Sequence, residues 1–318
     1  MTQVRKIIRK MKDLHNVANV RVSDAEAGQR IDNFLIRLCK GVPRSHVYRI
    51  LRSGEVRVNS RRVGPTYRLC VEDLLRIPPI RLSATKVRSA IPSEFPVVFE
   101  DEDLLVIDKP SGKAVHGGSG IDFGVIESLR AARANSTMLE LVHRLDRDTS
   151  GLLMIAKNRR TLTKLHSQMR EGQIYKRYLV LALGEWVGPG RTVSLPLKKY
   201  LDGSGERRVA VNRQEGVPAV TEFEPVARFK GYTLLSALLR TGRTHQIRVH
   251  LAHLGFPIAG DEKYGIFGRN RSLAKQGLSR LFLHATEIRF VHPGTGASLL
   301  FDCELPDELQ QFMESLEK

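Results

Sequence analysis

Three polar segments of this chain interrupt apolar surroundings and carry residue types that can do chemistry. The first, at residues 143–151, reads His-Arg-Leu-Asp-Arg-Asp-Thr-Ser-Gly and places Asp146 in a predicted loop just before a strand. The second is Tyr-Lys-Arg-Tyr at 175–178, and the third covers residues 241–250. Asp146 is a candidate for a fixed, buried carboxylate that acts as a nucleophile or a base. An aspartate among arginines is also the usual composition of a surface ion pair, so the residue alone does not decide.

Histidines crowd the third segment, which raises the question of a metal. His245, His250 and His253 lie on one predicted helix, where the last two share a face. No carboxylate or cysteine completes a zinc pattern around them, and the cysteines at 39, 70 and 303 lie far apart. We therefore predict no metal site, no disulfide framework and a reducing compartment, with a phosphate or backbone contact as the favoured role of these histidines.

The elements that must position these segments follow from apolar patterning. Residues 96–100 and 104–108 predict a hairpin. Further strands are predicted at 152–156, 176–183, 232–240 and 282–290, and helices at 125–134, 160–171 and 245–254. Strands outnumber helices and no glycine-rich dinucleotide-binding turn opens a helix, which argues against a doubly wound fold. We predict an α+β fold with a largely antiparallel, mixed sheet.

A small basic module is predicted ahead of that domain. Apolar residues at helical spacing indicate one helix after Gln29 and a second between Pro43 and Gly54. Residues 55–77 read as short strands with a polar turn at 60–62. The second helix leaves three arginines for exposed surface: Arg44, Arg49 and Arg52.

Positive charge is concentrated in the first third of the chain. The formal net charge is +17, from 51 Lys and Arg against 34 Asp and Glu. Residues 1–94 carry 20 basic and 8 acidic side chains, a balance of +12 that leaves +5 for the remainder. This excess predicts a polyanionic partner, because neutralising phosphates releases condensed counterions. A basic surface that only aids solubility is the alternative, and charge alone does not separate nucleic acid from an anionic membrane.

These patterns divide the chain into four parts. Residues 1–28 form a basic arm, 29–80 the small module, 81–94 a linker and 95–318 the larger domain. We expect the arm to contact RNA backbone, with an organelle-targeting peptide or plain disorder as alternatives. No apolar run approaches the roughly 18 residues that a membrane span needs. We therefore expect a soluble, cytoplasmic protein.

The small module resembles the RNA-binding domain of the ribosomal protein S4 type. The match is carried by Arg-Ile-Asp-Asn-Phe-Leu at 30–35 and Ser-Gly-Glu-Val-Arg-Val-Asn at 53–59, and it spans about residues 29–80. The resemblance implies RNA binding rather than catalysis, with the three arginines of the second helix as contacts. The alternative is that these arginines merely solvate a helix face.

The larger domain resembles the RluA family of pseudouridine synthases. The ordered signature consists of His-Arg-Leu-Asp with Thr-Ser-Gly, then Lys-Arg-Tyr-Leu at 176–179, then Gly-Arg-Thr-His-Gln-Ile-Arg-Val-His at 242–250. Lys-Pro-Ser-Gly at 109–112 and His-Gly-Gly-Ser-Gly at 116–120 fit as well, so the resemblance covers about residues 96–305. It implies an isomerase that turns uridine into pseudouridine within RNA.

The resemblance implies a role for three residues. Asp146 is the nucleophile, Tyr178 stacks on the target base and moves its proton, and Arg248 is the cation paired with Asp146. A guanidinium offsets the rise that burial causes in a carboxyl pKa, and its planar fork can bind both carboxylate oxygens. Attack on ribose, attack on the base and abstraction of a ribose proton all remain open for Asp146. Tyr178 could instead be an ordinary half-buried strand residue.

The implied reaction detaches uracil from ribose through nitrogen 1 and reattaches it through carbon 5. Nothing is oxidised and no group is gained, so we predict no cofactor and no metal. The target nucleotide must be extruded, and Arg144 is the candidate to fill the gap, because guanidinium planes stack on bases. Further RNA contacts are predicted from Lys176, Arg243 and His245. An ordinary phosphate contact or salt bridge is the alternative for Arg144.

The combination of both modules is most similar to family members that act on bacterial large-subunit ribosomal RNA. We therefore predict site-specific isomerisation in large-subunit (23S) ribosomal RNA by a monomer, with no membrane and no protein partner implied. A synthase for transfer RNA or another RNA is the alternative within the class. A non-catalytic RNA-binding ribosome-assembly factor is the alternative outside it, and the joint presence of Asp146, Tyr178 and Arg248 argues against it.

Overall fold

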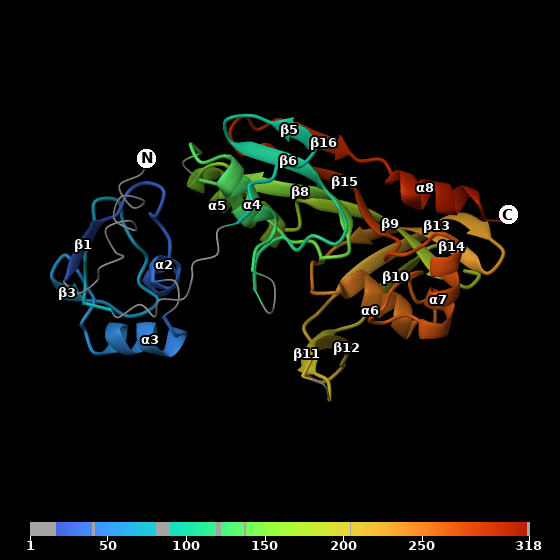
Figure 1. Cartoon of the computed structure of the whole chain (residues 1–318), viewed down its shortest axis with the longest axis horizontal. Helices are drawn as coiled ribbons and strands as arrows, with labels where there is room; N and C mark the ends of the chain where they lie inside the picture. Colours follow the sequence, from blue (N-terminus) through green and yellow to red (C-terminus); the bar gives the residue numbers. More distant parts are fainter. Residues whose placement is uncertain are drawn as a thin grey trace.

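The chain folds around two main β-sheets, one of four strands and one of ten (Figure 1). The computed structural model describes residues 17–39, 42–80, 90–118, 122–136, 138–203 and 205–316. The predicted arm up to residue 16 and the linker from 81 to 89 lie outside the described residues. No helix in the described ranges is long and apolar enough to cross a membrane.

The four-stranded sheet belongs to the N-terminal module and has the strand order β1-β4-β2-β3. Its strands are β1 (Ala18–Arg21), β2 (Arg57–Val58), β3 (Arg61–Arg62) and β4 (Leu74–Ile77), and its helices are α2 (Ile31–Leu38) and α3 (Arg44–Arg52). Both helices lie where apolar spacing predicted them. Their buried sides, including Phe34 and Ile50, join the sheet in one hydrophobic cluster. The module therefore has a core of its own.

Two boundaries of this module differ from the prediction. Residues 18–21, assigned above to the arm, pair with β4, and Val20 is fully buried. These four residues are too few for alternation of polar and apolar side chains to indicate a strand within a basic N-terminal segment. The turn lies at Asn59 and Ser60, both with positive φ (48° and 67°), so Arg61 already belongs to a strand. Such a two-residue turn needs left-handed backbone, which asparagine tolerates.

The ten-stranded sheet organises the larger domain. Its main path is β10-β13-β14-β9-β15-β8-β6-β5, with β16 beside β15 and β7 beside β8. The β15–β8 pair is parallel and every other described pair is antiparallel. This confirms the predicted α+β fold with a largely antiparallel, mixed sheet. The strands are β5 (Val97–Glu100), β6 (Leu104–Lys109), β7 (Glu140–Leu141), β8 (Ser150–Ala156), β9 (Tyr175–Leu183), β10 (Arg191–Ser194), β13 (Val220–Phe229), β14 (Tyr232–Leu239), β15 (Leu283–Val291) and β16 (Ser298–Asp302).

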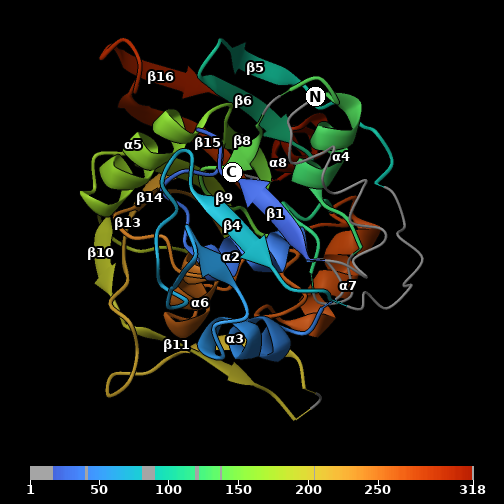
Figure 2. The ribbon, with the colours of Figure 1, turned by 90° about the vertical axis from the view of Figure 1, so that its left-hand side faces the viewer.

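Both faces of this sheet are covered, and strand alternation decides which helix each residue meets. On β6, Leu105 and Ile107 share a cluster with helix α4 (Val125–Ala132), whereas Leu104 and Val106 pack with α5 (Arg159–Arg170). Figure 2 shows these helices on either side of β6 and β8. Helix α6 (Gln246–His253) joins the α4 cluster, and α7 (Phe267–Lys275) and α8 (Asp307–Glu314) form a further one with β9 and β14.

A separate hairpin projects from the body of the larger domain, at the bottom of Figure 1. It consists of β11 (Leu197–Leu201) and β12 (Arg207–Val211), paired antiparallel. No element was predicted between residues 184 and 231, nor at α7, β16 and α8. Helix α8 does have apolar residues at helical spacing, Leu309, Phe312 and Met313, and β13 is ten residues long, so both lay within reach of these patterns. The remaining segments are polar or short, and apolar spacing alone does not mark them.

Candidate active site

Asp146 lies in the loop between β7 and β8, directly before β8, as predicted. The backbone N–H of Thr149 donates to the Asp146 carbonyl at 3.2 Å and closes a tight turn. The Asp146 side chain is 17% exposed, so it is neither sealed in the core nor free on the surface. A carboxylate in this position is held in place and still reachable from outside.

Lys109, at the end of β6, holds this loop in place through hydrogen bonds. Its Nζ donates to the carbonyls of Pro110 and Lys113, each at 2.8 Å, and to that of Arg147 at 3.1 Å. Ser111 adds a hydrogen bond to the Asp148 carbonyl at 2.7 Å. Burial lowers the pKa of Lys109 to about 7. The Lys-Pro-Ser-Gly segment thus connects the loop that carries Asp146 to the sheet.

Arg248, in α6, reaches Asp146 across 102 positions of sequence. Its Nη1 lies 3.4 Å from Oδ2 of Asp146. Its two-pronged contact is made elsewhere, because Nε and Nη2 each donate to Asp261 at 2.8 Å. Burial alone would lower the pKa of Arg248, but the hydrogen bonds and charge of Asp261 outweigh it and raise that pKa. The expected pairing with Asp146 is present, but the fork binds Asp261 and not both oxygens of Asp146.

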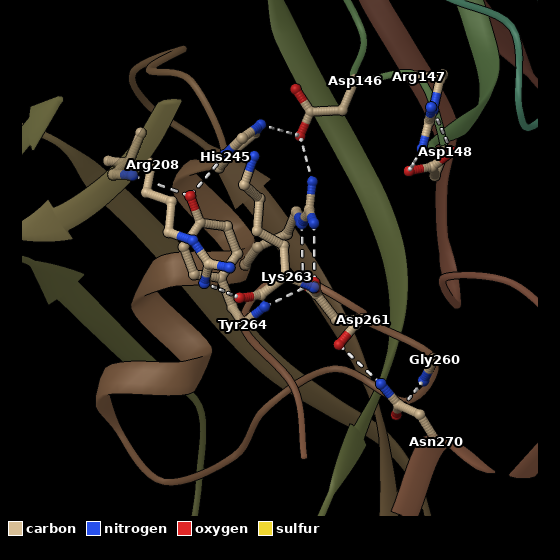
Figure 3. Close-up of polar contacts among 12 residues, drawn as sticks. Asp146, Arg147, Asp148, Arg208, His245, Gly260, Asp261, Lys263, Tyr264 and Asn270 are labelled. Atoms are coloured by element: carbon tan, nitrogen blue, oxygen red, sulfur yellow. Dashed lines mark hydrogen bonds and ion pairs between the residues drawn. The ribbon is translucent and has the colours of Figure 1, made fainter. Parts of the chain in front are cut away.

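His245 approaches the same oxygen of Asp146 as Arg248 does (Figure 3), with Nε2 3.9 Å from Oδ2. It precedes α6 and has a left-handed backbone with φ 54°. Burial lowers the pKa of His245 to about 4, against the opposing charge of Asp146, so the ring is neutral at neutral pH. Its Nδ1 contacts the hydroxyl of Tyr264 at 2.7 Å. Asp146 therefore faces one permanent cation and one neutral ring.

Strand β9 decides which tyrosine belongs to the site. Tyr178 is buried and shares the α4 and α6 side of the sheet, and it lines the same cavity as Asp146. Tyr175, three residues earlier, instead contacts the guanidinium groups of Arg240 and Arg289. Burial, followed by the charge of Asp146, raises the pKa of Tyr178 above its usual range. Its hydroxyl therefore stays protonated at neutral pH.

A cavity of about 570 Å³ brings the three polar segments together. Among the described residues that line it, Asp146 alone is acidic, and the basic ones are Arg144, Arg170, Lys176, Arg240, Arg243 and Arg248. Arg144 and Arg243 are exposed, whereas burial lowers the pKa of Lys176. An anionic substrate would find favourable potential around one carboxylate.

Other predicted residues lie elsewhere. Arg44, Arg49 and Arg52 are exposed on α3 of the N-terminal module, and Arg49 pairs with Glu55 at 3.1 Å. His250 is buried, with its ring nitrogens bonded to Thr221 and to the Leu195 carbonyl. Within the described part of the chain, no group of three or more His, Cys, Asp or Glu could hold a metal ion.

The turn at residues 261–264 contributes two residues that were not predicted from the sequence. Asp261 is 1% exposed and its carboxylate holds Arg248, while Tyr264 holds His245. The available signal was Gly-Asp-Glu-Lys-Tyr-Gly at 260–265, a polar run between two glycines that follows α6. A carboxylate with a charged partner 13 residues earlier has no local pattern that marks it as buried.

A carboxylate beside a buried guanidinium, in a cationic cavity on a mixed sheet, defines an enzyme that handles a polyanion by nucleophilic or acid–base chemistry. Comparison with known families agrees. Residues 103–253 match the family model described as RNA pseudouridylate synthase, and residues 29–75 match the S4 domain. The ribosomal large subunit pseudouridine synthase C of Pasteurella multocida (strain Pm70) is 49% identical over 307 residues, which are 94% of each protein.

Further relatives support the same assignment. The Escherichia coli (strain K12) protein of that name is 48% identical over 310 residues, 95% of this chain and 97% of its own. The solved structure of human RNA pseudouridylate synthase domain containing 4 is 25% identical, with a TM-score of 0.57 over 70% of this chain and 94% of that one. The chain belongs to the RNA pseudouridylate synthase family. It is an isomerase with an S4 domain, which confirms both resemblances noted in the sequence.

Proposed function

We propose that this enzyme converts specific uridines to pseudouridine in large-subunit (23S) ribosomal RNA, with Asp146 as the catalytic nucleophile. The observation that carries the site assignment is the position of Asp146, the one acidic side chain among the described residues of a cationic cavity, 3.4 Å from the buried Arg248. The ribosomal substrate is supported by the names of the relatives that are 48–49% identical over 94–95% of this chain.

The reaction is an isomerisation, and its balance is simple. The bond between ribose and nitrogen 1 of uracil breaks, the ring turns, and a bond to carbon 5 forms as the proton on carbon 5 leaves and nitrogen 1 regains one. The carboxylate of Asp146 lies beside the guanidinium of Arg248 and can attack carbon or accept a proton. The chemistry requires neither a redox partner nor an added group.

Tyr178 acts on the base rather than on the ribose in this proposal. Its ring offers a flat stacking surface in the cavity shared with Asp146. Because its pKa is raised, it enters the reaction as a protonated hydroxyl. It can therefore donate a hydrogen bond to the detached uracil or relay a proton, and it accepts the carbon 5 proton only if it passes on its own at the same time.

RNA contacts surround this centre. Arg144 is exposed at the cavity and is suited to fill the space of the extruded nucleotide. Lys176 and Arg243 line the same cavity and are proposed to contact the flanking backbone. His245 lines it too, but its ring nitrogens face Tyr264 and Asp146, so we assign this side chain to Asp146 rather than to the RNA. Arg44, Arg49 and Arg52 of the S4 domain would contact RNA at a distance from it. We propose that a single chain, working in the cytoplasm, suffices, because one copy supplies every residue of this site.

The test follows tritium from carbon 5 of uridine. Purified protein is incubated with tritiated 23S ribosomal RNA, and in parallel with transfer RNA, each unmodified. We expect release from the ribosomal substrate and a fall of at least about 1,000-fold in rate for Asp146→Asn, because the nearly isosteric amide is not a nucleophile.

The matched control is Asp148→Asn, two residues away. That carboxylate pairs with Arg147 at 3.0 Å and is 38% exposed, so its loss should leave the rate within about twofold. If tritium is released from transfer RNA alone, the substrate is transfer RNA and not 23S ribosomal RNA. If Asp146→Asn is fully active, another residue is the nucleophile.

A further inference from the structure

The turn at residues 261–264 lies behind the two groups that face Asp146. The carboxylate of Asp261 accepts both prongs of Arg248 at 2.8 Å, and it also accepts the backbone N–H groups of Lys263 at 2.9 Å and Tyr264 at 3.0 Å. Arg248 outweighs the effect of burial and lowers the pKa of Asp261. With Nε and Nη2 committed to Asp261, the Nη1 end of Arg248 is the one that faces Asp146.

Tyr264 fixes the position of His245, just as Asp261 fixes the position of Arg248. The Tyr264 hydroxyl accepts the backbone N–H of Val209 at 3.0 Å, and an amide nitrogen can only donate. The hydroxyl keeps its own proton to donate, and Nδ1 of His245, at 2.7 Å, is the acceptor that we infer for it. Because the ring is neutral, its single proton resides on Nε2, the nitrogen that faces Asp146.

Both groups approach the same oxygen. Nη1 of Arg248 and Nε2 of His245 lie 3.4 and 3.9 Å from Oδ2 of Asp146, and Figure 3 shows the other oxygen pointing away from these contacts. We propose that Asp261 and Tyr264 are positioning residues that hold Arg248 and His245 on one oxygen of Asp146 and leave Oδ1 free to react. This inference rests on the proposed function.

The turn is built to stay in one conformation. Asn270 brackets it, donating from Nδ2 to the Asp261 carbonyl at 2.8 Å and accepting from Gly260 N–H at 3.2 Å. Arg208, in the β11–β12 hairpin, donates to the Lys263 carbonyl at 2.8 Å. A Cβ on Gly260 would lie 2.0 Å from the Arg280 carbonyl oxygen, so the close packing of the turn requires glycine there. A rigid turn can transmit its geometry to the two side chains it holds.

Charge compensation gives Asp261 a reason to hold Arg248. Arg248 is 6% exposed, and a buried guanidinium without a counter-ion is strongly unfavourable. If Asp146 were the main partner of Arg248, the guanidinium would lose its counter-ion whenever Asp146 formed a bond or took a proton. Asp261 remains ionised through such a step, so Arg248 stays compensated while Asp146 changes state. A guanidinium gripping both oxygens of Asp146 would also leave no oxygen free to attack.

The experiment compares Asp261→Asn with wild type in the full-length protein. Single-turnover tritium release is measured with excess enzyme on tritiated 23S ribosomal RNA, alongside the Kd for the same RNA and the thermal unfolding midpoint. We expect the rate constant to fall about 100-fold, because a displaced Arg248 no longer orients Asp146, and the Kd to stay within about twofold. The control is Glu94→Gln, which removes a carboxylate from a two-pronged contact with Arg133 near the surface and should change neither value.

An Asp261→Asn protein that is folded and fully active overturns the proposal, as does one whose slower turnover is matched by weaker RNA binding. If Asp261→Asn does not fold, the Tyr264→Phe variant tests the proposal instead, because this substitution keeps the ring and removes only the hydroxyl. We expect about a 5-fold slower single turnover with unchanged Kd, which corresponds to the loss of the one hydrogen bond that orients His245. An unchanged rate for folded Tyr264→Phe overturns the proposal in that case. Wild-type release is measured first, so failure of the proposed function shows itself separately.

Discussion

Asp146 depends on residues that lie far from it in sequence and close to it in space. An aspartate can act as a nucleophile, but aspartates also occur in surface ion pairs. The residues around Asp146 show which of these two roles it can fill. Arg248 supplies a charge that is present at every physiological pH, and Lys109 holds the loop from behind. The carboxylate proposed as the nucleophile is thus placed by two buried basic side chains, one that contacts it directly and one that holds its loop.

Buried histidines make the stability of this site depend on pH. Burial lowers the pKa of His143 to about 3, while its Nε2 accepts the Met154 backbone N–H at 3.1 Å. In the unfolded chain the same group titrates near 6.5, so below that pH the unfolded state binds a proton that the folded state does not. The stability contribution is complete above about pH 6.5 and is lost as the pH falls toward 3.

We therefore expect the free energy of unfolding to decrease between pH 6.5 and 5, and His143→Gln to weaken this decrease by up to about 1.4 kcal/mol per pH unit. Urea unfolding at several pH values measures it. The exposed His253→Gln serves as the control and should follow the parent protein. Equal pH dependence in the parent and His143→Gln would show that His143 is not held neutral by the fold.

At the scale of elements, the parallel pair β15–β8 sets the position of the loop that carries Asp146. Gly151, at the start of β8, pairs with Ala285 and has φ 106°. A Cβ there would lie 2.3 Å from the Ala285 carbonyl oxygen, so the two strands can approach only where a glycine stands. The loop that carries Asp146 ends at this contact.

Gly151→Ala should therefore destabilise the protein by about 3 kcal/mol or more, because it combines a backbone clash with a left-handed conformation. Gly172→Ala separates the two effects. Gly172 also has positive φ (72°), but a Cβ there would meet nothing within 4 Å, so we expect a cost of about 1 kcal/mol. Chemical denaturation of both variants gives the comparison, and equal costs would exclude the clash as the cause.

At the scale of the whole molecule, positive charge is shared between two sites of different kinds. The cavity surrounds one carboxylate with cations, some of them buried. The S4 domain instead presents Arg44, Arg49 and Arg52 on the exposed side of α3. Exposed arginines that contact phosphate act through counterion release, so their contribution should depend on salt more steeply than that of the cavity.

Replacing Arg44, Arg49 and Arg52 with Gln in the full-length protein should weaken RNA binding and flatten its salt dependence. For each phosphate that is no longer neutralised, the slope of log K against log salt should fall by about 0.7 to 0.9. Single-turnover rates at saturating enzyme should stay near wild type. Arg133→Gln is the control, because Glu94 and Glu100 already hold that guanidinium. A salt slope equal to that of wild type would remove α3 from the RNA interface.

Sequence by itself determined the local features of this protein. The continuous apolar run of β8, the apolar spacing of α2 and α3, and the glycines and prolines that bound them are sufficient to predict these elements, since strand and helix formation depends on neighbours a few residues away. The three polar segments determined the family for the same reason, because each one is contiguous. Period-two alternation likewise requires Tyr175 and Tyr178, three residues apart, to lie on opposite faces of β9.

Only the tertiary structure decided how those segments meet. Asp146 and Arg248 are 102 residues apart, and nothing local distinguishes an arginine that binds Asp146 with its fork from one that binds Asp261. Asp261 and Tyr264 could not be predicted from the sequence because their function is to hold other side chains, and that role exists only once the chain is folded. Long-range pairing follows from packing of the whole sheet, whereas periodicity reports only which face of an element is buried.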